Sequence, residues 1–160
     1  MKKTFFISIL CLFAFAINAQ KFVDLGLPSG TKWKDVNESN INRPRISLFF
    51  NNFEISDAVS RSGGNTPTRE QWEELMNECE WIWVDTNGYG YKVVGPNGNH
   101  IILPAEGYSY IHGDVRYKGT FGCYWLGKDG AFKYIFFNAK EKRLCKDERN
   151  GGLSLRLVID

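Results

Sequence analysis

The residues best suited to chemistry in this chain are its cysteines, its histidines and its neighbouring carboxylates. A cluster of thiolates and imidazoles would bind a metal, and a serine or cysteine beside a histidine would act as a nucleophile. The sequence contains no Cys-x-x-Cys, no Gly-x-Ser-x-Gly and no cysteine pair beside His100 or His112. Asp147 and Glu148 are adjacent acids, but they lie in the charged run 140–149, which is typical of a solvated hairpin edge. These patterns favour a protein that is not an enzyme and that has no cofactor.

The first nineteen residues have the pattern of an export signal. Lys2 and Lys3 form a short basic segment, and an apolar run of about 13 residues follows at 5–17. Ile17-Asn18-Ala19 ends in a small residue, so we predict cleavage between Ala19 and Gln20. The apolar run is shorter than the roughly 20 residues of a membrane-spanning helix. We expect an exported protein (periplasmic, surface-located or secreted) with no membrane span, in which residues 20–160 form one domain.

The distribution of charge argues against a nucleic-acid partner. The chain has 20 Lys+Arg and 18 Asp+Glu, and the two surplus charges are those of Lys2 and Lys3. Residues 20–160 therefore have no net charge, whereas a nucleic-acid binder needs surplus basic residues to neutralise phosphates. All 16 glycines also lie after residue 19, and glycine with many aromatics favours a fold built mostly of strands.

Removal of the signal also removes Cys11 and leaves Cys79, Cys123 and Cys145. An odd number of cysteines allows at most one disulfide in an oxidising compartment. Cys79 falls on the apolar face of a predicted helix, where we expect a buried thiol. Cys123 and Cys145 both lie in strand-like runs, and they are the pair expected to be bridged if a disulfide forms.

Two helices and several strands are predicted to position these residues. The clearer helix spans 68–79, because Thr68 and Gln71 have the spacing of a capping box. Its apolar residues recur at i, i+3, i+4 and i+7, namely Trp72, Leu75, Met76 and Cys79. A weaker helix spans 56–61 and stops at Gly63-Gly64. Strands are predicted over 81–85, 89–94, 100–103, 121–127, 132–138 and 153–159, with a hairpin turn at Asn97-Gly98. The fold class is therefore α+β, with mostly antiparallel short strands and two helices.

Characteristic short motifs recur along nearly the whole of residues 20–160. They are Val23-Asp24-Leu25-Gly26-Leu27-Pro28-Ser29-Gly30-Thr31-Lys32-Trp33; Pro67-Thr68 with Trp72, Glu74, Leu75, Cys79 and Trp81; Gly90-Tyr91-Lys92-Val93; Gly95-Pro96-Asn97-Gly98-Asn99; Leu103-Pro104-Ala105; Gly107-Tyr108; Gly122, Tyr124 and Trp125; and Gly152, Ser154, Arg156 and Val158. Together these motifs resemble the major paralogous domain family named after Fibrobacter succinogenes, whose members are exported proteins also abundant in gut Bacteroidetes. The resemblance implies a fold similar to C-type lectin-like domains and to the sulfatase-modifying factor domain. It implies no established activity.

The chain departs from that family pattern in three places. Residues 37–55 replace a stretch rich in glycine and tryptophan, Asn65-Thr66-Pro67 is a reduced form of Trp-Arg-Met-Pro, and Leu126-Gly127-Lys128 replaces Ser-Ser-Thr. If these segments shape a ligand pocket in the family, the pocket of this chain is altered or lost. The sulfatase-modifying relatives bind copper through two cysteines, but neither Cys123 nor Cys145 lies in a matching motif. An oxidase of that kind is therefore an alternative rather than the main expectation.

The resemblance also indicates where a ligand would bind. C-type lectin-like folds present ligands on a loop-rich face before the final strands, which corresponds here to 108–130. The candidate ligand-binding residues of this segment are aromatic: Tyr108, Tyr110, Tyr117, Tyr124 and Trp125. Aromatic faces stack on sugars or on peptide side chains, although aromatics in strands also build cores. The calcium-binding signatures Glu-Pro-Asn and Trp-Asn-Asp of lectins are absent from the sequence.

These observations predict a recognition module that binds a glycan or a protein, or a surface scaffold. A structural subunit of a surface assembly is a further alternative. One charged residue is also expected inside the fold: Arg156 stands between Leu155 and Leu157 in an apolar run. We expect it to pair with a buried carboxylate, so that Arg156→Ala destabilises strongly.

Overall fold

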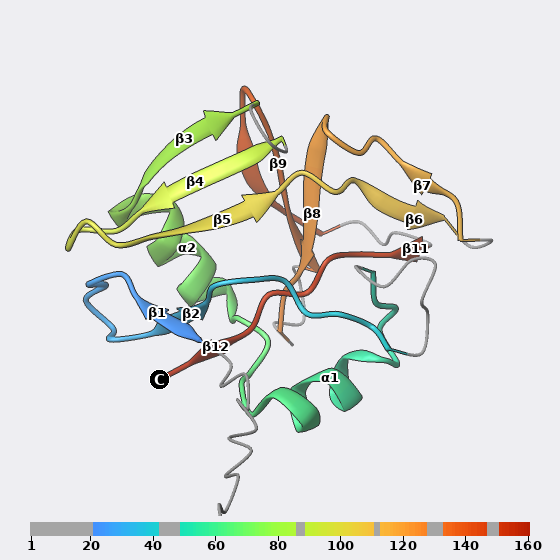
Figure 1. Ribbon diagram of the computed structural model, residues 1–160, viewed down its shortest axis with the longest axis horizontal. Coiled ribbons are helices and arrows are strands. Elements are labelled where there is room, and N and C mark those ends of the chain that lie inside the picture. The colour runs from blue at the N-terminus through green and yellow to red at the C-terminus, as the bar shows by residue number, and fades with distance from the viewer. Residues whose placement is uncertain (1–20, 42–48, 86–88, 111–112, 128–132, 147–150) are drawn as a thin grey trace, which may run out of the picture.

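The computed structural model describes residues 21–41, 49–85, 89–110, 113–127, 133–146 and 151–160. Within these residues the chain forms two helices and twelve short strands (Figure 1). The helices are α1 (Ile55–Ser62) and α2 (Arg69–Glu78). The strands are β1 (Phe22–Asp24), β2 (Lys32–Lys34), β3 (Glu80–Val84), β4 (Gly90–Val94), β5 (His100–Pro104), β6 (Tyr108–Tyr110), β7 (Val115–Arg116), β8 (Phe121–Trp125), β9 (Tyr134–Asn138), β10 (Lys142–Cys145), β11 (Gly151–Gly152) and β12 (Val158–Ile159).

The strands pair into four small antiparallel sheets. Their orders are β1-β2-β12, β3-β4-β5, β8 to β10 with β9 in the centre, and β7-β6-β11. The α+β class with short antiparallel strands is thereby confirmed. The predicted β4–β5 hairpin is also confirmed: Val94 pairs with His100, and the Gly95 N–H donates to the Asn99 carbonyl at 2.8 Å.

Helix α2 begins where its capping box predicts. The Gln71 N–H donates to Thr68 Oγ1 at 3.2 Å, and the Thr68 N–H donates to Gln71 Oε1 at 2.9 Å. Trp72 and Leu75 are fully buried in the main core, which also contains apolar residues of β4 and β5. In Figure 1 the helix lies against the β3–β4–β5 sheet. Cys79 differs from its prediction, because the chain is already extended there and its side chain is half-buried.

Helix α1 ends at the predicted glycine. Gly63 has a φ of 66°, the left-handed conformation that glycine adopts without steric cost, and its N–H donates to the Val59 carbonyl at 3.0 Å. Neither helix of the described residues has the length and apolar character needed to cross a bilayer.

The β8–β9–β10 sheet is an internal wall that contributes to two core clusters. One face carries Tyr124, Ile135 and Phe137, which belong to the main core. The other carries Cys123 and Phe136 and packs with Leu153 in a second cluster. The two outer strands differ in exposure, because β8 is mostly buried whereas β10 begins with two exposed residues. These two residues, Lys142 and Arg143, belong to the charged run that was predicted to be a solvated edge.

The C-terminal segment is not the continuous strand that was predicted over 153–159. In Figure 1 it crosses the middle of the molecule from β11 to β12, and residues 152–158 are all buried. Its carbonyls accept hydrogen bonds from four separate segments. Leu153 accepts from Phe50, Ser154 from Trp125, Leu155 and Leu157 from the segment 34–38, and Val158 from Asn65. Because buried backbone groups must be hydrogen-bonded, this enclosed segment bonds to each of the segments around it and not to one neighbouring strand. It therefore forms no single ladder and shows no alternation of buried and exposed residues.

Candidate functional site

Two of the five predicted ligand-binding aromatics are structural. Tyr124 has no exposed surface, and burial raises the pKa of its hydroxyl to about 12. Its ring stacks on Phe137 with centroids 5.6 Å apart. Trp125 is half-buried, and its indole N–H donates to the Phe50 carbonyl at 2.7 Å. Both side chains hold core segments together. The burial of Tyr124 corrects the prediction that its ring contacts a ligand, whereas for the half-buried Trp125 this stays a prediction.

The other three aromatics lie close together around β6 and β7. Tyr108, Tyr117 and Phe121 stack with centroids 5.0–6.2 Å apart, and the Arg116 guanidinium lies 4.9 Å from the Tyr110 ring. We call Tyr108, Tyr110 and Tyr117 the aromatic surface. Tyr117 is 55% exposed and has a φ of 61°, an uncommon backbone conformation for a bulky residue. These three side chains lie outside the linings of the two hollows described next.

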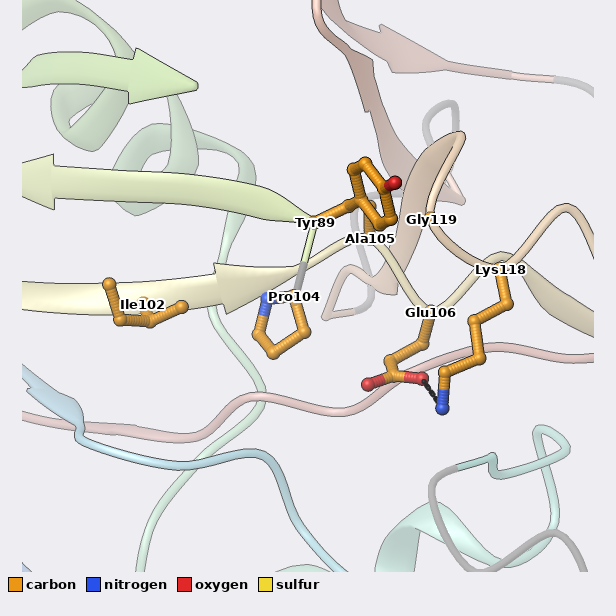
Figure 2. Close-up of a pocket in the computed structure, with 7 residues that line it drawn as sticks. All are labelled: Tyr89, Ile102, Pro104, Ala105, Glu106, Lys118 and Gly119. Atoms are coloured by element: carbon orange, nitrogen blue, oxygen red, sulfur yellow. Dashed lines mark ion pairs between the residues drawn. The ribbon is translucent and has the colours of Figure 1, made fainter. Parts of the chain in front are cut away.

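A hollow of about 190 Å³ opens beside the aromatic surface, at the end of β5 (Figure 2). Its lining is Tyr89, Ile102, Pro104, Ala105, Glu106, Lys118 and Gly119. Figure 2 shows the Glu106 and Lys118 side chains pointing toward each other, and their carboxylate and ammonium are 3.0 Å apart. Glu106 is 15% exposed and Lys118 67%, so the carboxylate lies inside the hollow and the ammonium at its rim.

Backbone contacts hold the walls of this hollow in place. The Ala105 N–H donates to the Tyr89 carbonyl at 2.8 Å, and the Gly119 N–H donates to the Ala105 carbonyl at 2.7 Å. A Cβ on Gly119 would lie 2.7 Å from the Tyr89 ring, so only glycine allows the loop to pass this close. The Tyr89 side chain is 52% exposed and presents much of its surface to solvent.

A second hollow of about 260 Å³ adjoins the first. Its lining is Asp35, Val36, Asn37, Ile102, Pro104, Glu106 and Arg156. Ile102, Pro104 and Glu106 line both hollows, so we treat the two as halves of one depression, the Glu106 groove. Five segments from distant parts of the sequence meet there: the stretch after β2, Tyr89 before β4, β5 with the residues after it, the β7–β8 connection and the C-terminal segment.

Buried side chains tie the floor of the groove together. The Tyr124 hydroxyl donates to the Pro104 carbonyl at 2.8 Å and accepts from Asn37 Nδ2 at 2.9 Å. Arg156 is fully buried, and it donates from Nη1 to the Lys34 carbonyl at 2.7 Å and from Nη2 to the Ile102 carbonyl at 2.5 Å. These bonds join β2, β5 and β8 through the C-terminal segment.

The expected buried carboxylate partner of Arg156 is therefore replaced by backbone carbonyls. Burial lowers the pKa of Arg156 from its usual value, while the nearby Tyr124 hydroxyl and the carboxylates of Asp35 and Glu38 oppose that effect. Glu38 is itself engaged by the buried ammonium of Lys34, and it also accepts from Ser62 Oγ at 2.7 Å. Because the buried Glu38 carboxylate is already paired with Lys34, the Arg156 guanidinium donates to the backbone carbonyls of the segments that pass beside it.

The geometry also contradicts a Cys123–Cys145 disulfide. Both residues are buried thiols in one sheet, but Cys123 is in β8 and Cys145 in β10, with β9 between them. Neighbouring strands are about 4.8 Å apart, so the two Cα atoms are separated by about 10 Å or more. A disulfide requires about 4.4–6.8 Å. The rings of Tyr134 and Phe136 pack in the same cluster, and the two sulfurs do not form an adjacent ligand pair for copper.

The described residues contain no group of three or more histidine, cysteine, aspartate or glutamate side chains that could hold a metal ion. His100 is exposed at the start of β5. The signal segment 1–19 with its cleavage position, His112, residues 128–130 of the predicted ligand face, and the Asp147-Glu148 pair lie outside the described residues.

Sequence reasoning missed most of the groove. Only Lys118 and Gly119 fall in the predicted 108–130 face, whereas Tyr89, Glu106 and Asp35 were not singled out. Two signals in the sequence pointed to it: Asn37 begins the segment in which the chain departs from the family pattern, and Leu103-Pro104-Ala105 is one of the motifs that carry the resemblance.

A scan against protein-family models, a search of curated proteins and a search of solved structures each found no match.

Proposed function

We propose that this chain is an exported, non-catalytic carbohydrate-recognition domain of C-type lectin-like fold, whose glycan ligand binds in the Glu106 groove. The observation that carries the proposal is the mostly buried Glu106 carboxylate, paired with Lys118, beside the half-exposed Tyr89 ring. The export signal and the family resemblance of the motifs support the location and the fold in this proposal.

The groove offers the contacts that a sugar ring needs. The C–H face of a pyranose packs on an aromatic or proline surface, which Tyr89 and Pro104 provide. The hydroxyls need fixed hydrogen-bonding groups, and the Glu106 carboxylate can accept from them while the Lys118 ammonium donates. The two hollows together have the size of small-molecule sites, which is about 300–1,000 Å³.

The same contacts support binding without turnover. Hydrolysis of a glycosidic bond uses two carboxyl groups, one of which must act as a general acid. Glu106 forms an ion pair with Lys118, an arrangement that suits it to accept hydrogen bonds. Oxidase chemistry of the sulfatase-modifying type would need adjacent cysteine sulfurs, and β9 stands between Cys123 and Cys145.

A glycan array with the purified protein tests the proposal, followed by calorimetric titration of any hit. We expect saturable binding that Tyr89→Ala and Glu106→Gln each weaken by about tenfold or more, because each removes a central contact. Tyr110→Ala is the matched control: it removes an exposed tyrosine of the aromatic surface, outside the groove, and should leave the affinity unchanged.

Other results would redirect the assignment. An empty array together with a stoichiometric protein partner would replace the glycan by a protein ligand, and concentration-dependent self-association would favour a scaffold. Cleavage of a bound oligosaccharide would refute the non-catalytic part, with Asp35 and Glu106 as the carboxylates to substitute first. Export is tested by the N-terminus of the protein recovered outside the cytoplasm, which should be Gln20.

A further inference from the structure

The second half of the Glu106 groove contains two polar atoms that the protein itself does not satisfy. Asn37 Oδ1 and Arg156 Nε are buried and have no hydrogen-bond partner. Both side chains line the second hollow. One atom is an acceptor and the other a donor, and unsatisfied buried groups of this kind call for a specific partner.

This half of the groove has no excess of positive charge. Asp35 and Glu106 each contribute one negative charge and Arg156 one positive charge, and Lys118, which lines the other half, brings the groove as a whole to neutrality. The site therefore provides no net attraction for a phosphate or a sulfate. It therefore favours a neutral ligand with directional hydrogen bonds.

The rim of the same hollow is apolar. Val36 is 57% exposed and Ile102 is 38% exposed, and both line the hollow together with Pro104. The site thus combines one acceptor, one donor and a surface for a small apolar group. A secondary amide that ends in a methyl group matches all three features, because its N–H donates, its carbonyl accepts and its methyl packs on the apolar rim.

We infer that this half of the groove recognises the acetamido group of an N-acetylated sugar residue, with the amide N–H donating to Asn37 Oδ1 and the amide carbonyl accepting from Arg156 Nε. The inference rests on the proposed carbohydrate function and specifies its ligand class. Both atoms are buried in the unbound protein, so the contact requires them to become accessible when the ligand binds. The Asn37 side chain is therefore the direct reporter of this contact.

Two trisaccharides with the same backbone linkage test the inference. Chitotriose and cellotriose are both β-1,4-linked, and they differ at carbon 2, where one has an acetamido group and the other a hydroxyl. Calorimetric titration of the purified protein should give at least about tenfold tighter binding of chitotriose. Cellotriose has no amide at carbon 2, so it leaves Asn37 Oδ1 and Arg156 Nε without their partners. In a two-dimensional NMR titration, the Asn37 side-chain amide should shift with chitotriose and stay in place with cellotriose.

A pair of valine variants separates the acetamido contact from general binding. Val36→Ser removes the exposed apolar rim and should reduce the preference for chitotriose several-fold while the melting temperature is retained. Val115→Ser is the matched control, because Val115 is 41% exposed in β7 and lies outside the groove lining. A loss of preference in Val115→Ser instead would overturn the placement of the ligand.

The remaining outcomes each contradict a defined part of the reasoning. Equal affinity for the two trisaccharides, or binding of other glycans but neither of these, would overturn the acetamido inference and leave the carbohydrate function standing. An N-acetylated dipeptide that binds tighter than chitotriose would show that the site reads a peptide amide. The absence of any glycan binding would overturn both the inference and the proposed function.

Discussion

Substitution of Arg156 tests the central packing argument most directly. The fully buried guanidinium donates to the carbonyls of Lys34 and Ile102, and so joins β2 and β5 through the C-terminal segment. Arg156→Ala removes both hydrogen bonds and leaves both carbonyls without this donor. It also removes side-chain volume next to a hollow that already measures about 260 Å³.

The expected loss follows from these contacts. A hydrogen bond from a charged donor contributes about 1.5–3 kcal/mol net, so two such bonds contribute about 3–6 kcal/mol. Part of this is offset because the variant no longer buries a charge, a cost that the lowered pKa of Arg156 reflects. We therefore expect Arg156→Ala to reduce the free energy of unfolding by about 3–5 kcal/mol, or about 10–15 °C in melting temperature at roughly 3 °C per kcal/mol.

Urea unfolding followed by tryptophan fluorescence measures this change. Arg156→Met retains most of the volume but no donor, so it should recover only the part of the loss due to the vacated space, about 1–2 kcal/mol. Arg61→Ala, at an exposed position in the last turn of α1, is the control and should change stability by less than about 0.5 kcal/mol. A loss below about 1 kcal/mol for Arg156→Ala, or an Arg156→Met variant more stable than the native protein, would refute the reasoning. Either result would mean that the cost of burying the charge outweighs the two carbonyl bonds.

Three further expectations concern single contacts. Tyr124→Phe should cost about 1–3 kcal/mol by leaving the Pro104 carbonyl without its donor, whereas Tyr110→Phe should be nearly neutral; equal effects in urea unfolding would contradict the burial argument. Burial, with the carboxylates of Glu74 and Glu78, raises the pKa of Cys79 to about 11. The folded state therefore holds this proton more tightly, which contributes to stability below about pH 9 and no longer does so as the pH approaches 11. The pH midpoint of Cys79 alkylation should be near 11 in the folded protein and near 9 in urea, and coincident midpoints would show an exposed thiol. Thr68→Ala should cost about 1 kcal/mol through the lost cap, and Thr68→Ser, which retains a hydroxyl, should restore most of it.

The elements that could be predicted from the sequence are those whose causes are local. Helix α2 follows from Thr68, Gln71 and an apolar stripe within twelve residues, and the β4–β5 hairpin follows from a turn of five residues between two apolar runs. In both cases the residues that determine the structure are neighbours along the chain. Propensity, capping and periodicity are then sufficient.

The predictions that failed concern contacts between distant segments. The run 153–159 has the composition of a strand, but its bonding partners come from four separate segments. The strand-like runs around Cys123 and Cys145 were recognised, but their separation depends on the strand order, which places β9 between them. Tyr124 was assigned to a ligand face, although it is buried in the core, because alternation along a strand does not say which face is covered.

The sequence by itself thus determined the export pattern, the neutral charge of residues 20–160, the α+β class and the best helix and hairpin, since each depends on composition or on residues close together in the chain. Only the tertiary structure decided where a ligand could bind. The Glu106 groove joins residues 35–37, 89, 102–106, 118–119 and 156, which are up to about 120 positions apart in the sequence. The partners of Arg156 were decided in the same way, because Lys34 and Ile102 become its neighbours only when the C-terminal segment passes through the middle of the fold. Contacts of this kind between distant residues leave no periodicity or motif in the sequence, because they are produced by tertiary packing.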